Sequence, residues 1–393
     1  MDIKIFADIL EDSASKQINE LKTHPMFNDS KIRIMPDCHA GAGCVIGFTS
    51  TFKDKVIPNL IGVDIGCNID AINIGKLAID YDLFDKKVRE IVPLGMSIHQ
   101  KSDNKVFDLF VDTLYCKNEL KNIDRITKSA GTLGNGNHFC ELDKDNEGNI
   151  WLVIHTGSRN LGKQVADIYQ KLAINATHDN GNERENIIEK LKKEGKTKEI
   201  QFILDGMKGS RNLEIPNDLC WLEGNNMKDY LHDMKICQEF ALYNHRMIQK
   251  SILENVINTE PMEVITSVHN YINFDDMIMR KGAISAHEGE KVVIPMNMRD
   301  GTIIGVGKGN EDWNCSAPHG AGRLMSRTKA RQCIKLDEYE KSMEGISTTS
   351  VNSNTIDEAP MAYKPMSVIV NAIKDTVEII RIIKPVYNLK AND

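Results

Sequence analysis

Short hydrophobic runs separated by glycine turns dominate the first 75 residues. They predict strands at 32–35 and 44–48, with further strand character over 60–74. Two polar segments, 36–43 and 62–68, interrupt these runs. The N-terminal part of the chain is therefore predicted to be β-structure whose polar loops could face a site.

Residues 80–130 change to a helical pattern. Their apolar positions recur every three or four residues, which predicts one buried helix face. The face would comprise Val106, Leu109, Phe110, Thr113 and Leu114.

Residues 160–260 are also predicted to be helical and are highly charged, with a solvated peripheral insertion at 182–198. A later amphipathic helix carries an apolar stripe that we assign to core packing. The stripe comprises Met227, Tyr230, Leu231, Met234, Cys237, Phe240 and Ala241. Because no linker rich in proline, glycine or serine separates this helix, we expect one domain, 1–393, with a helical subregion at about 160–260.

Strand patterns return on both sides of this helical region. The strand at 151–154 ends in His155, and the segment 263–271 contains His269. Further strands are predicted at 291–295, 302–306 and 379–383, and a helix near 368–372. Together the patterns predict an α+β fold, with mixed sheets enclosing the site and helices outside.

Composition narrows the class of protein. The chain has 393 residues, of which 41% are hydrophobic, enough for a large core. We expect a cytoplasmic protein, because the N-terminus lacks a signal-peptide pattern and no apolar stretch is long enough to span a bilayer. The nine cysteines include no Cys-x-x-Cys pair and do not suggest a disulfide framework.

Charge is unevenly distributed. The net charge of −7 argues at first against a polyanionic partner. Residues 278–335, however, hold ten Lys and Arg against five Asp and Glu, a net +5 that leaves −12 for the rest. A basic site on an acidic body can still attract a negatively charged substrate.

His319 stands at the start of a glycine-containing basic segment. The residues after it favour a helix, on which Arg323, Arg327 and Arg331 would share one face, and no acid lies between His319 and Lys335. A phosphate could use both the helix N-terminus and these arginines. A solvated basic face with a structural histidine explains the same segment.

Five potential metal ligands lie on glycine-rich turns or strand ends: Asp64, Cys67, His138, His155 and His269. The glycine-rich loop 131–141 would also bring Asn137 and Glu141 close to His138. Five ligands exceed one tetrahedral ion, and a shared thiolate could bridge two ions, with manganese, cobalt or zinc favoured over magnesium. Structural histidines remain the alternative, and a phosphate loop, a nucleotidyl-transfer Lys-x-Asp-Gly and a dinucleotide fingerprint are missing.

Nearly the whole chain resembles the RtcB family of RNA-splicing ligases. Long motifs that follow the family's order carry the resemblance. They are Pro36-Asp37-x-His39, Gly62-Val63-Asp64-Ile65-Gly66-Cys67, Gly131-Thr132-Leu133-Gly134-x-Gly136-Asn137-His138-Phe139, His155-Thr156-Gly157-Ser158-Arg159, His269-Asn270-Tyr271, Arg280-Lys281-Gly282-Ala283 and His319-Gly320-Ala321-Gly322-Arg323-x-x-Ser326-Arg327.

The resemblance implies a ligase that joins RNA 3′-phosphate or 2′,3′-cyclic phosphate ends to 5′-hydroxyl ends with GTP and two Mn²⁺ ions. His319 would be the nucleophile that carries GMP, oriented by Asp37. Cys67 would bridge one ion held with Asp64 and His138 and another held with His155 and His269. The expected nucleotide contacts are Asn137, Glu141, Lys281, Ala321, Tyr363 and Lys390, and Arg159, Arg323 and Arg327 are expected near the phosphates or RNA ends.

Two departures from the family pattern suggest a divergent paralogue. Asn68 follows Cys67 where the family commonly has glycine, and Met296-Asn297-Met298-Arg299 replaces the usual Gly-Ser-Met-Gly beside the nucleotide. Arg299 adds charge, and the lost glycines would restrict how closely a ligand approaches the backbone. We expect altered GTP binding, and a role in RNA repair in preference to tRNA splicing.

Two other functions fit the same residues. One is a dinuclear metallohydrolase that opens cyclic phosphates without GTP, and the other is a non-catalytic protein that binds RNA ends. An archease-type activator is a further partner that the family resemblance suggests.

Overall fold

A curved sheet of eight strands forms the centre of the computed structural model, which describes residues 1–178, 181–206 and 215–391. Its strands follow the order β13-β14-β17-β6-β7-β5-β9, and β16 pairs with β17. The end strands β9 and β13 meet where the Val293 N–H donates to Ser267 Oγ at 2.9 Å, so the sheet is nearly a closed barrel. The strands are β5 (Asn68–Gly75), β6 (Phe139–Lys144), β7 (Ile150–Thr156), β9 (Glu263–Val268), β13 (Lys291–Asn297), β14 (Gly301–Gly307), β16 (Ser347–Thr348) and β17 (Val377–Leu389).

A second sheet of five strands has the order β1-β2-β3-β11-β10, and two short pairs, β12-β15 and β4-β8, complete the β-structure of the described residues. Strands β1 with β2 and β16 with β17 pair in parallel, and the other pairs are antiparallel, so the sheets are mixed as predicted. The bounds are β1 (Asp2–Ile5), β2 (Lys31–His39), β3 (Ile46–Thr51), β4 (Lys55–Val56), β8 (Leu222–Glu223), β10 (Asn270–Asn273), β11 (Ile278–Lys281), β12 (Ala283–Ser285) and β15 (Ser316–Pro318).

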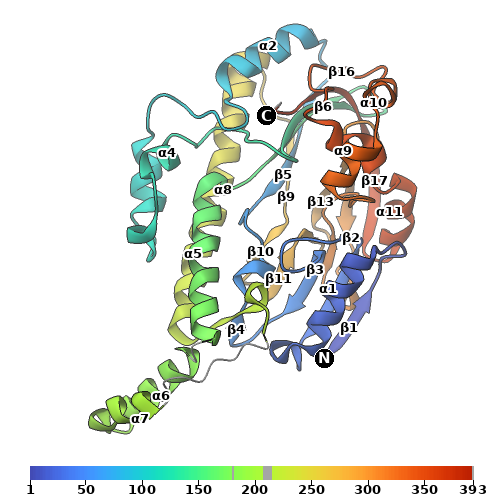
Figure 1. The fold of residues 1–393 in the computed structure, drawn as a ribbon. Helices are drawn as coiled ribbons and strands as arrows, with labels where there is room; N and C mark the ends of the chain where they lie inside the picture. The colour runs from blue at the N-terminus through green and yellow to red at the C-terminus, as the bar shows by residue number, and fades with distance from the viewer. Residues whose placement is uncertain (179–180, 207–214, 392–393) are drawn as a thin grey trace.

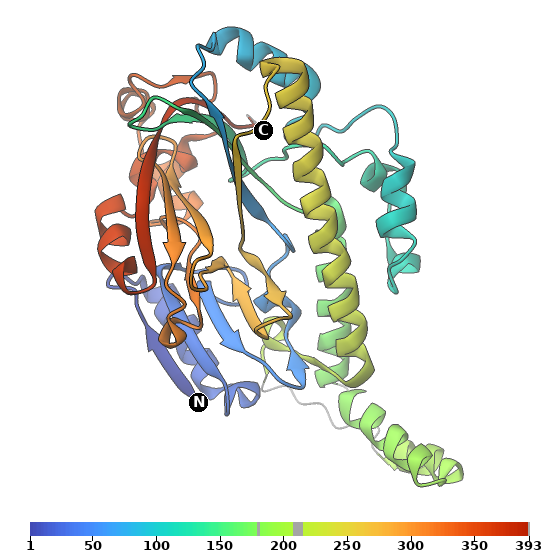
Figure 2. The same ribbon diagram turned by 180° about the vertical axis from the view of Figure 1, so that it is seen from behind.

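The helices lie around these sheets. Figure 1 shows α5 and α8 side by side along one flank and α9, α10 and α11 on the other, and Figure 2 shows the sheets between the two groups. Helices α6 and α7 project away from the body. The bounds are α1 (Asp12–Thr23), α2 (Tyr81–Ile91), α3 (Asn104–Val106), α4 (Ile123–Thr127), α5 (Arg159–His178), α6 (Gly181–Lys193), α7 (Ile200–Gly206), α8 (Gly224–Ile252), α9 (Arg327–Cys333), α10 (Leu336–Ser342) and α11 (Met366–Ala372).

The predicted α+β fold is confirmed, with two local differences in the strands. Strand β2 continues through the polar residues 36–39, because Asp37 is fully buried and hydrogen-bonded to His319. The segment predicted as one strand over 263–271 forms two strands in different sheets, β9 and β10. His269 lies at the point where the chain passes from one sheet to the other.

The predicted helix face within 80–130 is partly wrong. Val106 and Phe110 are buried, but Leu109 is 56% exposed and Thr113 is exposed, whereas Val111 is buried. The reason is a π-helical turn at Phe107–Val111, whose wider winding turns Leu109 toward solvent. A pattern based on the α-helical period cannot anticipate this turn.

The long helix α8 confirms the predicted apolar stripe. Most of the stripe packs into the core, and its two remaining members, Met227 and Leu231, are half-buried. The predicted insertion at 182–198 is peripheral, since α6 projects from the body and the side chains of 187–198 are mostly exposed. The side chains of 182–186 lie outside the described residues. In the described ranges, every helix is too short or too polar to cross a membrane.

Asp233 on α8 connects three segments, and its replacement tests the packing of this helix. Its buried carboxylate accepts hydrogen bonds from the N–H groups of Tyr115 and Cys116 and from the Tyr169 hydroxyl. Asp233→Ala leaves these donors unpaired and is expected to lower the free energy of unfolding by roughly 2–4 kcal/mol, measured by urea denaturation. Glu239→Ala, at an exposed site on the same helix, is the control, with an expected change below about 0.5 kcal/mol. Equal stabilities would contradict this role of Asp233.

Candidate active site

The register of the central sheet brings Cys67, His155 and His269 to one edge. Strand β5 begins at Asn68, which pairs with β7 on one side and with β9 on the other. Cys67, directly before β5, therefore lies beside His155 near the end of β7 and beside His269 directly after β9. The His269 N–H also donates to the Cys67 carbonyl at 3.0 Å.

His138 reaches the same edge from the glycine-rich loop that precedes β6. The next residue, Phe139, pairs with His155 across β6 and β7. The loop glycines Gly131, Gly134 and Gly136 all have positive φ angles, of 76°, 88° and 74°, so the predicted non-helical loop is confirmed. The loop thus turns sharply enough to place His138 beside the ends of the neighbouring strands.

The five predicted ligands form a continuous series of contacts with Cys67 at its middle. Asp64 Oδ2 lies 3.0 Å from His138 Nε2, which lies 3.6 Å from Cys67 Sγ. On the other side, Sγ lies 3.3 Å from His155 Nε2, and that nitrogen lies 3.4 Å from His269 Nε2. The ligand atoms of Cys67, His138 and His155 all lie within 4.8 Å of one another. Such a group could hold a metal ion.

The close approach of Asp64 depends on the backbone after His155. A Cβ atom at Gly157 would lie 2.3 Å from Asp64 Oδ1, so only glycine leaves room for the carboxylate. The Ser158 N–H donates to the same oxygen at 3.0 Å. The carboxylate is therefore held with Oδ2 toward His138.

Backbone carbonyls orient two of the imidazoles. His138 Nδ1 lies 3.0 Å from the Leu133 oxygen, and His155 Nδ1 lies 3.2 Å from the Asn137 oxygen. A carbonyl accepts a hydrogen bond, so His155 Nδ1 carries the proton and its Nε2 presents a lone pair to the cluster. His138 faces an acceptor on both sides, because its Nε2 contacts the Asp64 carboxylate. His269 Nδ1 is buried and has no hydrogen-bond partner among the described residues.

Burial is the largest influence on the pKa values of the cluster. Burial raises the pKa of the Cys67 thiol well above its ordinary value, and the Asp64 carboxylate raises it further. Burial lowers the pKa values of His138, His155 and His269, which favours neutral imidazoles. Burial also raises the pKa of Asp64, but hydrogen bonding to His138 outweighs it and brings that pKa to about 2. Neutral imidazoles and a carboxylate around a thiol suit a divalent metal.

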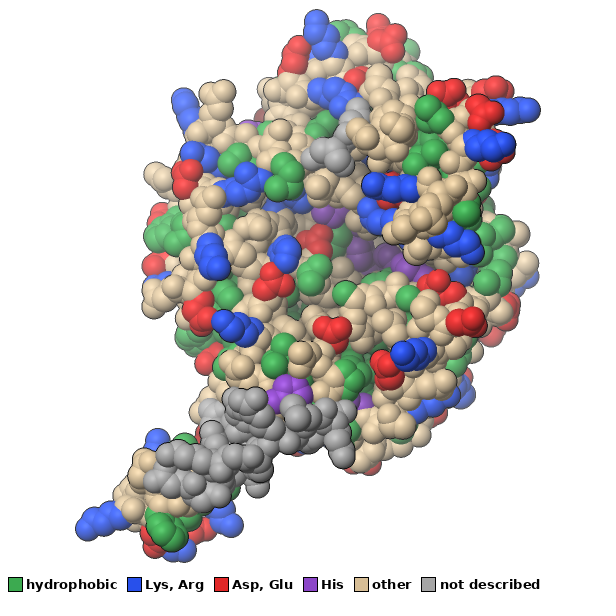
Figure 3. Space-filling view, in the orientation of Figure 1, with side chains coloured by type: hydrophobic (Ala, Val, Ile, Leu, Met, Phe, Trp, Pro, Cys, Tyr) green, Lys and Arg blue, Asp and Glu red, His purple; other side chains and the backbone are tan. Residues whose placement is uncertain are grey.

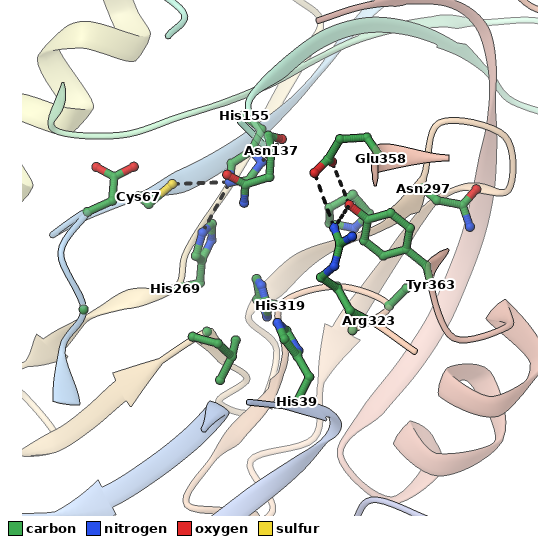
Figure 4. Close-up of a pocket in the computed structure, with 18 of the residues that line it drawn as sticks. His39, Cys67, Asn137, His155, His269, Asn297, His319, Arg323, Glu358 and Tyr363 are labelled. Atoms are coloured by element: carbon green, nitrogen blue, oxygen red, sulfur yellow. Dashed lines mark hydrogen bonds and ion pairs between the residues drawn. The ribbon is translucent and has the colours of Figure 1, made fainter. Parts of the chain in front are cut away.

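His319 follows β15 directly and lies next to this cluster, as Figure 4 shows. Its ring centroid is 5.0 Å from that of His269. Its Nδ1 lies 2.7 Å from Oδ2 of the fully buried Asp37, and its backbone N–H donates to the same oxygen at 3.2 Å. Gly322 (φ 72°) permits this packing, because a Cβ there would lie 2.0 Å from the Asp37 carbonyl oxygen.

The cluster and His319 open into a cavity of about 630 Å³. Figure 3 shows histidine side chains inside this hollow and Lys and Arg side chains at its rim. Most of the predicted site residues line it: Asp64, Cys67, Asn137, Glu141, His155, His269, Lys281, His319, Ala321, Arg323, Arg327, Tyr363 and Lys390. Asp37 and His138 lie behind the lining. Arg159 also lies behind it, with its Nε donating to Thr132 Oγ1 at 3.1 Å and its Nη1 3.4 Å from His138 Nδ1.

The predicted arginine stripe is wrong in its geometry. Helix α9 begins only at Arg327, and Arg323 precedes it in an extended bridge with Tyr363. The glycines at 320 and 322 keep the chain after His319 non-helical, so Arg323 shares no helix face with Arg327 and Arg331.

Two acids that the sequence analysis missed neutralise these arginines. Glu358 is 3% exposed and forms ion pairs with Arg323 (3.4 Å), Arg327 (3.3 Å) and Lys390 (2.9 Å). The neighbouring Asp357 pairs with Arg327 and Arg331. Burial raises the pKa of Glu358, but the three cations outweigh it and lower that pKa to about 2. The acids lie more than 25 residues after the arginines, so local sequence gave no signal of the pairing.

The remaining predicted contacts have polar partners at the cavity wall. Burial raises the pKa of Glu141 to about 7, and its Oε2 accepts a hydrogen bond from Asn388 at 2.7 Å. Lys281 donates to the carbonyl oxygens of Ala42 (2.6 Å) and Asn59 (2.8 Å). The Tyr363 hydroxyl donates to Glu358 Oε2 at 2.7 Å. These contacts hold the polar side chains of the cavity wall in fixed positions.

The comparisons with known proteins identify the family. A family model described as "tRNA-splicing ligase RtcB" matches residues 17–114 and 115–391. The chain belongs to the RtcB family. Two relatives come from two strains of Escherichia coli and are named "RNA-splicing ligase RtcB" and "RNA-splicing ligase RtcB1". Each is 30% identical to this chain, and each match covers 96% of this chain and 94% of the relative. The "tRNA-splicing ligase RtcB" of Nanoarchaeum equitans is 25% identical, with 93% of this chain and 89% of that protein covered.

The second departure from the RtcB pattern, Met296-Asn297-Met298-Arg299, is accommodated locally. In the described backbone, neither Met296 nor Arg299 has a positive φ, so these positions do not require glycine. Met296, Asn297 and Met298 line the main cavity, whereas Arg299 pairs with Asp300 at 2.8 Å and lines a neighbouring cavity of about 340 Å³. The expected extra charge of Arg299 therefore lies outside the main cavity.

Glu358→Gln tests the charge balance of the cavity. The folded pKa of Glu358, about 2, is below its ordinary value of 4.5, so its stabilisation is present above about pH 4.5 and is lost as pH falls toward 2. We expect the variant to lose roughly 2–4 kcal/mol of unfolding free energy at neutral pH, with the difference shrinking below about pH 4.5. Urea denaturation across this pH range measures both effects. The exposed Glu338→Gln on α10 is the control, and a loss independent of pH would contradict the charge argument.

Proposed function

We propose that this protein is an RNA ligase that joins RNA 3′-phosphate or 2′,3′-cyclic phosphate ends to 5′-hydroxyl ends, with GTP and two Mn²⁺ ions. The observation that carries the proposal is the position of His319, 5.0 Å between ring centroids from His269 at the edge of the ligand cluster. An imidazole next to potential metal ligands, in a cavity lined by arginines and lysines, suits chemistry on phosphate. Membership of the RtcB family, whose relatives carry the names of RNA- and tRNA-splicing ligases, supports RNA as the substrate.

His319 is the proposed nucleophile. Asp37 accepts the hydrogen bond from Nδ1, so Nε2 keeps its lone pair, and the side chain is 17% exposed. In the first step Nε2 attacks the α-phosphorus of GTP, an N–P bond forms, and the bond to pyrophosphate breaks. The product is a histidine–GMP intermediate, and Asp37 stabilises the positive charge that develops on the ring.

The later steps transfer GMP to the RNA and then release it. The RNA 3′-phosphate oxygen attacks the same phosphorus, the N–P bond breaks, and an activated RNA-ppG end forms. The 5′-hydroxyl oxygen then attacks the 3′-phosphorus, and GMP leaves with its phosphate. Arg323 and Arg327 at the cavity wall are the proposed partners of these phosphates. Arg159, which the family resemblance places near the RNA ends, lies behind His138 and outside the cavity lining.

The ligand cluster would hold two ions in this proposal, with the Cys67 sulfur available to both. The proposed sets are Asp64, Cys67 and His138 for one ion, and Cys67, His155 and His269 for the other. The order of the contacts supports this division. Cys67 Sγ lies at the middle of the series, with Asp64 and His138 on one side and His155 and His269 on the other. When bound, the ions would neutralise phosphate oxygens and lower the pKa of an attacking hydroxyl.

The charge of the cavity supports a role for metal ions in GTP binding. Its lining contains four carboxylates, Glu11, Asp64, Glu141 and Glu358, and four cations, Lys281, Arg323, Arg327 and Lys390. Burial raises the pKa of Glu141 to about 7, so this carboxyl is only partly ionised near neutral pH and the lining carries little net charge. The side chains alone therefore offer little net attraction to a triphosphate. The proposed contacts with the guanine nucleotide are Asn137, Glu141, Lys281, Ala321, Tyr363 and Lys390.

Intact-mass measurement after incubation with GTP and Mn²⁺ tests the proposed nucleophile. The wild-type protein is expected to gain the mass of one GMP, and His319→Ala is expected to lose the adduct because Nε2 forms the bond. His287→Ala is the matched control, since this histidine is 43% exposed and outside the cavity lining. The control is expected to form the adduct at the wild-type level.

The same samples, incubated with RNA that ends in a 2′,3′-cyclic phosphate, separate the alternatives. Ligation together with an adduct supports the ligase. Opening of the cyclic phosphate without an adduct would replace the ligase with a metallohydrolase. Retention of RNA with neither activity would leave a protein that only binds RNA ends.

A further inference from the structure

A buried contact between a histidine and a carboxylate lies behind the ligand cluster. His245 on α8 is 1% exposed, and its Nδ1 lies 2.7 Å from Oδ2 of Asp70 on β5, which is 2% exposed. On the other side of the ring, Nε2 lies 3.0 Å from the backbone oxygen of Thr156. That oxygen also lies 3.3 Å from the Sγ of Cys67. A path of direct contacts therefore runs from Asp70 through His245 and Thr156 to the thiol.

The partners of His245 fix the orientation of its ring. A carboxylate and a carbonyl accept hydrogen bonds, and the two ring nitrogens face one of each, at 2.7 Å and 3.0 Å. The imidazole is therefore held between β5 and the end of β7.

The groups around the pair hold it in place. The Thr266 hydroxyl donates to Asp70 Oδ1 at 2.6 Å, and the Gln249 amide donates to Oδ2. Asp70 thus accepts bonds from α8 on one side and β9 on the other. The contact between His245 and Asp70 thus joins α8 to β5, which follows Cys67, and to β9, which precedes His269.

The residue next to His245 links the same helix to the other ligand-bearing segments. Asn244 is fully buried, its Nδ2 donates to the carbonyl oxygen of Gly157 at 3.1 Å, and its Oδ1 accepts from the N–H of Gly131 at 2.7 Å. Gly157 follows the His155 segment, and Gly131 begins the loop that carries His138. Two adjacent residues of α8 therefore contact the chain segments that carry Cys67, His138 and His155.

We propose that His245 is a positioning residue of the metal centre. With one ring nitrogen at Asp70 and the other at the Thr156 carbonyl, it fixes that carbonyl and thereby the spacing of the Cys67 thiol and the His155 imidazole. This inference rests on the proposed metal-binding function and adds a residue that touches neither metal nor substrate. Groups that orient metal ligands from behind commonly change metal affinity by about 10–100-fold when they are replaced.

Cobalt binding by the full-length protein tests the positioning role. Co²⁺ bound to a thiolate gives a charge-transfer absorption band, which reports on the sulfur contact independently of ligase activity. His245→Gln keeps most of the side-chain volume but lacks the two opposed ring nitrogens that contact Asp70 and Thr156, and is expected to bind Co²⁺ about tenfold more weakly with a weaker band. His232→Gln is the control, because His232 lies on the same helix beside Asp233 but is 41% exposed. It is expected to match the wild type.

The outcomes separate this inference from the proposed function. If the wild type shows no cobalt–thiolate band, the proposed metal binding at Cys67 is contradicted, and so is the positioning role of His245. If the wild type shows the band and His245→Gln binds Co²⁺ with the same affinity and spectrum, the metal centre stands and the positioning role is overturned. A thermal unfolding curve of the metal-free variant accompanies the titration, and lower stability with unchanged cobalt binding also overturns the role.

Discussion

The contact of the Cys67 thiol with the imidazoles of His138 and His155 is the interaction on which the candidate site depends. Strand β5 can bring the thiol there only in its observed register, in which Asn68 pairs with β7 and β9 at once. A slip by one residue would turn every side chain of the strand to the opposite face. The nearly closed sheet, the glycine-rich loop before β6 and the support from α8 all preserve this register.

Charged side chains elsewhere at the site are paired with one another. Glu358 and Asp357 hold the arginines that line one wall, and the Asp37 carboxylate holds His319 at the other. Buried charges are stable in a protein only when they are paired. The result is a cavity whose cations are fixed in position, with their charge largely offset, beside a cluster that suits added divalent ions.

Much of this arrangement could be predicted from sequence, because the informative residues lie at strand ends and in glycine loops. Periodicity placed His155 and His269 at the ends of strands, and the three glycines after residue 130 indicated the loop that carries His138. The pairing of Arg323 with Glu358 could not be predicted, since the residues are 35 positions apart and meet only through tertiary packing. The exposure of Leu109 was missed because a π-helical turn breaks the period on which the prediction rested. His245 was missed because a histidine within a helix gives no local sign of its partners on distant strands.

The most direct measurement of the central claim is a crystal structure of the protein with Mn²⁺ and GTP, with anomalous diffraction used to locate the metal. The account predicts two anomalous peaks, both within coordination distance of Cys67 Sγ. It also predicts continuous density between His319 Nε2 and a single phosphorus. Absence of metal beside Cys67, or an intact triphosphate bound away from His319, would contradict it.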